Sequence, residues 1–225
     1  MALPRLDSNP RVGDQVFEAI HSAIMSGDFP GGYRLQPGEL AVDLGTSIMP
    51  VREAIKRLKA LQLVEEVPYR GAVVKMLSYE ELLHIYTVRK LLEVEATALG
   101  AAHVTAEDIA RVRSGCAAMS EALDSNEVSE YIDRDEEALE QIYQASGNPV
   151  LIDTIRVLWS RCRPFKIAGV RAQLEAGDTG PLLVHQLSLI DALERGDAPA
   201  AAEITAESLD AAIERIRNAI SEEAN

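Results

Sequence analysis

Three basic side chains in the first third of the chain are spaced to do chemistry together. Arg52, Lys56 and Lys59 follow one another at intervals of four and three residues, so one helix face would present all three. The other face of this segment carries apolar residues at helical spacing, namely Val51, Ile55, Leu58 and Leu61. A guanidinium and two ammonium groups donate hydrogen bonds to phosphate oxygens and base edges. The pattern therefore predicts a helix that reads an anionic polymer, with an apolar side against a core.

The preceding residues predict how this helix is held. Pro37–Leu44 is typical of a short helix that Gly45 ends, and Ser47 is placed to cap the helix that follows. Two short helices joined by a tight turn form a helix-turn-helix, whose second helix enters the major groove of DNA. An amphipathic helix over Val12–Ser26 is expected to brace this pair from behind.

A hairpin is predicted directly after the reading helix. Leu63–Val67 and Ala72–Lys75 are β-branched runs that flank the turn Pro68–Gly71, so the hairpin would form a wing. Taken together, these segments resemble the winged-helix domain of GntR-type bacterial transcription regulators. The resemblance is carried by Pro30–Leu35, Leu40–Ala41, Leu44–Ser47, Pro50–Ala54 and Arg70–Ala72.

This resemblance implies a DNA-reading surface. Its residues would be Ser47, Ile48, Met49, Arg52, Lys56, Tyr69, Arg70 and Gly71. The family usually has arginine where this chain has Ile48, which can touch a thymine methyl group but cannot read guanine through two hydrogen bonds. The alternative for Arg52 is a surface ion pair with Glu39 or Glu53.

Composition and charge limit the function classes. The chain has 225 residues, is 47% hydrophobic and 4% aromatic, and carries a net charge of −14. Residues up to Lys75 hold nine basic and nine acidic side chains, whereas the remainder holds 13 basic and 27 acidic ones. We therefore expect local basic spots, modest non-specific DNA affinity and an acidic body that stays away from phosphate. Two cysteines, no signal peptide and no membrane-spanning run indicate a cytoplasmic protein.

The second half reads as helix after helix. Ser78 and Glu81 form a capping box for a helix over Tyr79–Ala101, whose expected core face carries Leu82, Ile85, Val88, Leu91 and Leu92. Thr105 is predicted to cap the second helix, which carries Ile109, Val112, Cys116 and Met119. A third is expected over residues 128–145, and a fourth begins at Asn148–Pro149 and continues at least to Phe165. The fifth, over 181–194, carries Leu183, Leu187 and Ile190, and the last runs over 198–220. The segment Gly169–Gly180 has no clear periodicity.

This half resembles the all-helical effector domain of the FadR subfamily of GntR regulators. The resemblance is carried by Arg89–Glu93, by Tyr143–Pro149 and by His185 with Ile190–Asp197. It implies a mostly α chain with two domains: residues 1–77, a winged helix with a polar arm (Met1–Arg11) and a linker, and residues 78–225, an antiparallel helical bundle for effector binding and dimerisation.

Many members of the subfamily bind a divalent metal that helps to hold a small carboxylate effector. Carried over position by position, the family's ligands fall on Asp135, Leu139, His185 and Ser208, so only a carboxylate and one imidazole remain. The resemblance therefore implies a degraded metal site with no cofactor and an Asp135–His185 hydrogen bond, with a family-type divalent metal as the alternative. Glu136, Glu140 and Glu207 are expected to point to other helix faces.

The implied effector pocket consists of Arg89, Asp135, Leu139, Trp159, His185 and Ser208. Each has a structural alternative: Arg89 can pair with Glu93 one turn on, and His185 and Trp159 can simply fill the core. Arg161, Arg163, Lys166 and Arg171 form a basic run that is solvated unless an effector phosphate or carboxylate uses it.

The sequence therefore predicts a homodimeric transcription regulator, and more specifically a repressor, that binds a palindromic double-stranded DNA operator. A small anionic effector bound in the helical domain would modulate operator binding, and no membrane is involved. One alternative is a DNA-binding dimer without an effector. A second is an enzyme that uses Asp135 and His185 as an acid–base pair, although the chain has no nucleophile motif and no phosphate loop.

Overall fold

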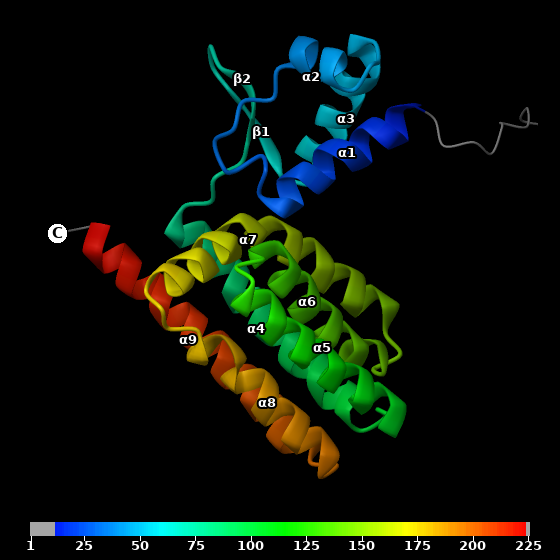
Figure 1. Cartoon of the computed structure of the whole chain (residues 1–225), viewed down its shortest axis with the longest axis vertical. Coiled ribbons are helices and arrows are strands. Elements are labelled where there is room, and N and C mark those ends of the chain that lie inside the picture. Colours follow the sequence, from blue (N-terminus) through cyan, green and yellow to red (C-terminus); the bar gives the residue numbers. More distant parts are fainter. Residues whose placement is uncertain (1–11, 224–225) are drawn as a thin grey trace, which may run out of the picture. The chain divides into compact units, whose positions relative to one another are not determined.

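The computed structural model describes residues 12–223 and divides into two compact units, with the boundary between Met76 and Leu77 (Figure 1). The predicted polar arm Met1–Arg11 lies outside the described residues. The first described unit is built from helices and one hairpin, and the second is entirely helical.

The N-terminal unit is a winged helix-turn-helix. Its elements in chain order are α1 (Val12–Ser26), α2 (Pro37–Asp43), α3 (Ile48–Ala60), β1 (Val64–Val67) and β2 (Gly71–Val74). The strands pair antiparallel, with Val64 opposite Val74 and Val67 opposite Gly71, and Arg34 adds one further bridge to Val73. The predicted hairpin is confirmed, with strand ends that differ by one residue from those expected.

The core of this unit explains the orientation of α3. Val51, Ala54 and Leu58 of α3 are fully buried. They pack against a cluster that includes Ile20 and Ile24 of α1, so the opposite face of α3 is exposed to solvent. Leu61, expected on the same stripe, is instead 39% exposed because α3 ends at Ala60 and Leu61 is already its C-cap.

The C-terminal unit is a bundle of helices in the described part of the chain. They are α4 (Tyr79–Ala101), α5 (Ala106–Asp124), α6 (Val128–Gln144), α7 (Pro149–Glu175), α8 (Gly180–Glu194) and α9 (Ala198–Glu223). The helix α4 packs against α6, α7 and α9, while α5 packs against α6 and α8. The predicted Ser78–Glu81 capping box is present, since each residue's side chain bonds the other's backbone N–H at 3.1 Å.

The helix α7 resolves the segment that lacked a clear pattern. It continues from Pro149 through an internal Pro164 as far as Glu175, and α8 begins at Gly180. Pro164 removes one backbone donor from the helix, but the buried Ile167 and Val170 that follow keep the last turns against the core.

The core-facing side of α4 differs from the predicted one. Leu82 and Ile85 are buried as expected, but Val88 is exposed and Leu91 is 71% exposed. The inward line passes instead through Arg89 and Glu93, because a polar network occupies the interior at that level. On α8, Leu187 is likewise exposed (54%) although it was expected in the core, whereas Leu189 and Ile190 are buried.

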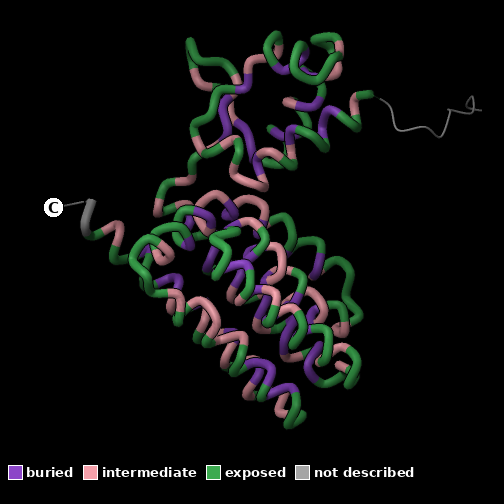
Figure 2. The backbone as a smooth tube through the Cα atoms, in the orientation of Figure 1, coloured by how far each residue is buried: buried purple, intermediate pink, exposed green. Residues whose placement is uncertain are grey.

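Two helices of this unit approach each other unusually closely. A Cβ added to Gly100 of α4 would lie 1.9 Å from the carbonyl oxygen of Ile142 on α6, so only glycine fits there. Figure 2 shows the buried residues along the inward faces of the helices and the exposed ones outside.

Both cysteines, Cys116 and Cys162, are free thiols inside this core, and burial raises the pKa of Cys116 to about 11.

Candidate functional site

The N-terminal end of α3 is open to solvent. Ser47 takes the N-cap position with an extended backbone, but its hydroxyl makes no capping hydrogen bond. Ile48 and Met49, the first helical residues, are 46% and 61% exposed. A hydroxyl and free backbone N–H groups at a helix N-terminus suit a phosphate oxygen, and the two apolar side chains suit thymine methyl groups.

The basic residues of α3 divide into two groups. Arg57 pairs with Asp14 at 2.7 Å and lies over the ring of Phe17, and Lys59 pairs with Glu66 of the wing. Within residues 12–223, the side chains of Arg52 and Lys56 form no ion pair or hydrogen bond. The predicted basic face thus keeps only these two cations available.

A groove of about 850 Å³ separates α3 from the wing. Its basic lining residues are Arg34, Arg52, Lys56, Lys59 and Arg70. The sequence did not identify Arg34 as a groove residue. Its place in the groove follows from the bridge between Arg34 and Val73 of β2, which only the structure shows. Glu39, Glu65 and Glu66 also line the groove, so its positive charge is local and not a broad basic face.

The tip of the wing carries an aromatic side chain in a strained backbone position. The Arg70 N–H donates to the Val67 carbonyl at 3.0 Å, and Tyr69, after Pro68, has φ +65°. This is the pattern of a type II turn, whose third position favours glycine. The Tyr69 ring is fully exposed at the tip.

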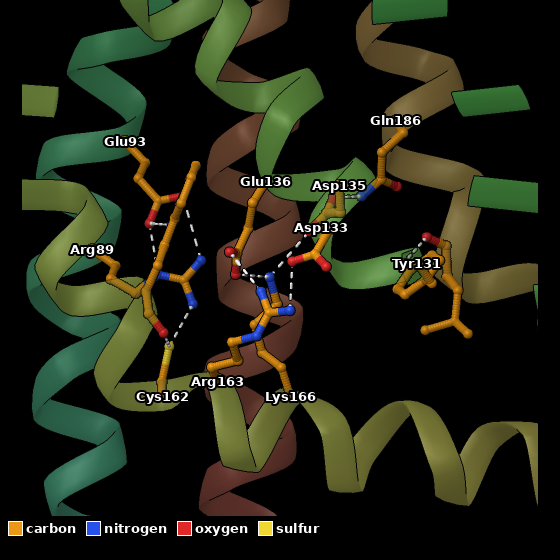
Figure 3. Close-up of polar contacts among 12 residues, drawn as sticks. Arg89, Glu93, Tyr131, Asp133, Asp135, Glu136, Cys162, Arg163, Lys166 and Gln186 are labelled. Atoms are coloured by element: carbon orange, nitrogen blue, oxygen red, sulfur yellow. Dashed lines mark hydrogen bonds and ion pairs between the residues drawn. The ribbon is translucent and has the colours of Figure 1, made fainter. Parts of the chain in front are cut away.

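The interior of the helical unit holds two polar clusters, shown in Figure 3. The first surrounds Glu93, which is only 1% exposed. Its carboxylate accepts hydrogen bonds from Arg89 Nε at 2.6 Å, from Trp159 Nε1 at 3.0 Å and from the Tyr143 hydroxyl at 3.2 Å. Burial opposes the charge of Arg89, but the Glu93 carboxylate outweighs it and raises the pKa of that guanidinium.

The second cluster centres on Lys166 of α7, whose side chain is 14% exposed. Its ammonium donates to Asp135 Oδ2 at 3.1 Å and to Glu136 Oε1 at 3.2 Å. Arg163, one turn earlier, donates to Glu136 Oε2 at 3.0 Å, and Gln186 Nε2 of α8 donates to Asp135 Oδ1 at 2.8 Å. Burial alone would lower the pKa of Lys166, but the charges of Glu136 and Asp135 raise it instead.

Comparison with known proteins agrees with this architecture. Residues 12–74 match the bacterial regulatory proteins of the gntR family, and residues 84–211, more than half of the chain, match the FCD domain. This chain belongs to the GntR family. The winged helix followed by an FCD domain is the FadR-type architecture that the sequence predicted, and GntR proteins of this kind are transcription regulators and not enzymes.

Individual GntR relatives cover much of the chain. An uncharacterized HTH-type transcriptional regulator of Agrobacterium vitis is 37% identical over 123 residues, 53% of this chain and 72% of the relative. McbR of Escherichia coli is 29% identical over 150 residues, 67% of this chain and 68% of McbR. A probable D-xylose utilization operon transcriptional repressor of Paenarthrobacter nicotinovorans is 29% identical over 188 residues, 83% of this chain and 80% of the relative.

The structure of Escherichia coli McbR superimposes with a TM-score of 0.77 and 26% identity, covering 94% of this chain and all of McbR. A GntR regulator from Rhodococcus, with a TM-score of 0.78 and 22% identity, shares the fold over 92% of this chain and 98% of its own. No described helix of this chain is long and apolar enough to cross a membrane.

The implied effector residues of the FCD domain are only partly brought together. Arg89 and Trp159 meet at Glu93, and Asp135 lies in the Lys166 cluster. The other three, Leu139, His185 and Ser208, are each half-buried, with Leu139 packed against the core. Arg89 therefore faces inward, as the resemblance implied, but it forms the ion pair that was its alternative.

Two expectations for this FCD domain are wrong. Asp135 bonds Lys166 and Gln186, and His185 makes no hydrogen bond to it in the part of the chain that the structure describes, because α8 presents the next residue to α6. Glu136 does not point elsewhere but shares Lys166 with Asp135. Their long side chains let Lys166 and Glu136 meet although helical spacing puts Glu136 about 100° away from Asp135. Facing i, i+3 pairs, Asp133 with Glu136 and Arg163 with Lys166, are the signal that would have found this cluster.

Proposed function

We propose that this GntR regulator is a homodimeric repressor that reads a palindromic operator with the N-terminal end of α3, the groove and the wing tip. The contacting residues are the predicted Ser47, Ile48, Met49, Arg52, Lys56, Tyr69, Arg70 and Gly71, with Arg34 added. The Paenarthrobacter relative is described as a probable repressor, which supports repression here. A dimer suits a palindrome, since two equal heads match two equal half-sites.

The main support for this DNA-reading surface is that some cations of α3 are held in ion pairs and others are not. Arg52 and Lys56 are exposed and make no side-chain bonds among the described residues, so they can bind DNA without first breaking an ion pair. Arg57 and Lys59 would have to leave Asp14 and Glu66. The positive charges of the N-terminal unit that are not held in ion pairs therefore lie near the start of α3 and along the groove.

The test compares Arg52→Ala with Lys59→Ala. Operator DNA is first selected from genomic fragments, and Kd is then measured by fluorescence anisotropy at fixed salt. Arg52→Ala should cost about 1–3 kcal/mol of operator affinity, whereas Lys59→Ala should cost little. Equal losses for both variants, or none for Arg52→Ala, would show that the reading surface lies elsewhere.

The effector is proposed to be a small organic anion that binds within the FCD domain. Arg89, which is buried, and Lys166, whose side chain is 14% exposed, are cations held by carboxylates of the chain itself. A ligand carboxylate would compete with Glu93 or with Asp135 for them. A wholly apolar interior would have favoured a regulator without an effector, but this interior contains two polar clusters. A thermal-shift screen of small mono- and dicarboxylates tests the proposal. If none changes the Tm or the operator Kd, the effector-independent dimer is the correct reading.

A further inference from the structure

The ammonium of Lys166 binds Asp135, the position on which the family's metal-binding aspartate falls. It lies between the carboxylates of Asp135 and Glu136, which are neighbours in sequence on α6 (Figure 3). As a whole residue, Asp135 is 7% exposed. Two carboxylates that share one ammonium, with side chains 9% and 18% exposed, repel each other and need a cation between them.

The surrounding residues do not fit a metal ion. Both oxygens of Asp135 are engaged, one by Lys166 and one by the Gln186 amide, and both oxygens of Glu136 are engaged, by Lys166 and Arg163. Gln186 Oε1 is a buried acceptor without a partner, but one amide oxygen cannot complete a coordination shell. Among residues 12–223, no three His, Cys, Asp or Glu side chains are grouped to hold a metal.

We propose that Lys166 is a cation built into the chain in place of a divalent metal, so that the FCD domain of this regulator works without one. The ammonium binds both Asp135 and Glu136 and so joins α6 to α7. Through its other oxygen Asp135 also holds Gln186, so the same centre fixes α8. The inference goes beyond the proposed function, because it concerns what holds the domain together and not what DNA it reads.

The arrangement also fits the limits of a single positive charge. A divalent ion could balance both carboxylates alone, whereas one ammonium cannot. Arg163 supplies the second charge, with its side chain only 5% exposed and bonds to Glu136 and, at 2.5 Å, to Asp133. Two cations on successive turns of α7, Arg163 and Lys166, thus bind three carboxylates of α6, namely Asp133, Asp135 and Glu136.

The first experiment removes the charge while keeping the shape. Lys166→Met retains most of the apolar stem, so packing changes little, but it leaves Asp135 and Glu136 without the ammonium. The Tm of the full-length protein should fall by roughly 6–20 °C. Lys90→Met is the matched control in the same domain, since Lys90 pairs with Asp210 at the surface, and its Tm should hardly change. A Lys166→Met protein as stable as the control would overturn the proposal.

A double variant separates the loss of charge from general damage. Asp135→Asn removes one carboxylate, so the double variant Asp135→Asn with Lys166→Met should regain part of the Tm that Lys166→Met lost. Additive losses in this cycle would contradict a direct charge interaction.

The unmodified protein provides a measurement that stands even if the variants do not fold. Elemental analysis should find no stoichiometric transition metal, and neither chelator nor added Zn²⁺, Mn²⁺ or Ni²⁺ should move its Tm. Stoichiometric metal, or a chelator-sensitive Tm, would refute the built-in cation. Operator binding is scored separately, so a failure of this proposal and a failure of the reading surface are told apart.

Discussion

Tyr69 combines a strained backbone conformation, which lowers the stability of the fold, with a ring that is exposed to solvent. A bulky side chain with a positive φ is strained, and such strain persists in folded proteins mainly where it serves a function. The turn at the wing tip would be relaxed with glycine at this position, as in most type II turns. Instead, the chain holds a fully exposed aromatic ring at the end of the hairpin.

Replacing this residue should therefore move stability and affinity in opposite directions. Tyr69→Gly removes the strain and should raise the stability of the N-terminal unit by about 0.5–1 kcal/mol, while weakening operator binding severalfold. Tyr69→Ala, which removes the ring but keeps a Cβ at positive φ, should lose affinity without gaining stability. Chemical denaturation and anisotropy titration measure the two effects. Unchanged affinity in both variants would remove Tyr69 from the reading surface.

At this same scale, the sequence predicts which residue types matter better than which partners they choose. The basic face of α3 was visible from spacing alone, but its division into free and paired cations depends on Asp14 and on Glu66, which lie in other elements. In the interior, Asp135 was found through the family resemblance. Its partners Lys166 and Gln186 were not, because they depend on the rotation of α7 and α8 about their axes.

At the scale of elements, capping and helix-ending residues predict where helices lie, but they do not predict which face of each helix is buried. Ser78, Thr105 and Asn148 each cap a helix in the structure, since these side chains satisfy the free N–H groups of a first turn. The predicted face of α4 was partly wrong because it assumed an apolar interior. The Arg89–Glu93 pair lies on the buried face of α4. A prediction from hydrophobic periodicity assigns charged residues to the exposed face and therefore chose the wrong side at this level.

The close contact of α4 with α6 leads to a matched pair of glycine substitutions. Gly100→Ala would force the two helices apart and should destabilise the helical unit by about 1–3 kcal/mol, or more if the backbone cannot shift. Gly169→Ala lies inside α7 with open space around the new methyl group, so it should stabilise the same unit by about 0.5–1 kcal/mol. Thermal denaturation of both variants checks the contrast. A Gly100→Ala protein as stable as Gly169→Ala would mean that the α4–α6 spacing is not as close as described.

At the scale of the whole molecule, the connection between the two units is short. The Lys75 N–H still bonds the Leu63 carbonyl at 2.9 Å, Leu77 packs against the helical core, and Ser78 belongs to the capping box of α4. Met76, between these residues, is largely exposed. A ligand acts by preferring one of two states, and so short a connection would carry that preference from α4 to the wing.

Lengthening this connection should separate binding from response. Insertion of Gly-Ser-Gly-Gly between Met76 and Leu77 adds a flexible spacer and should leave operator Kd within about tenfold of the original value. The factor by which an active carboxylate changes operator Kd should fall towards one. Titrations with and without that carboxylate measure both quantities. A response that survives the insertion would show that the signal does not pass through this connection.

The burial of both cysteines has a practical consequence for anyone who wishes to follow this protein by spectroscopy. Thiol-reactive dyes attack the thiolate, and burial both hides Cys116 and Cys162 and raises the pKa of each thiol. A new cysteine on the surface, such as Val42→Cys at the exposed end of α2, would therefore react far ahead of the native pair. The wild-type background is thus ready for site-specific fluorescent labelling, and neither native cysteine has to be replaced first.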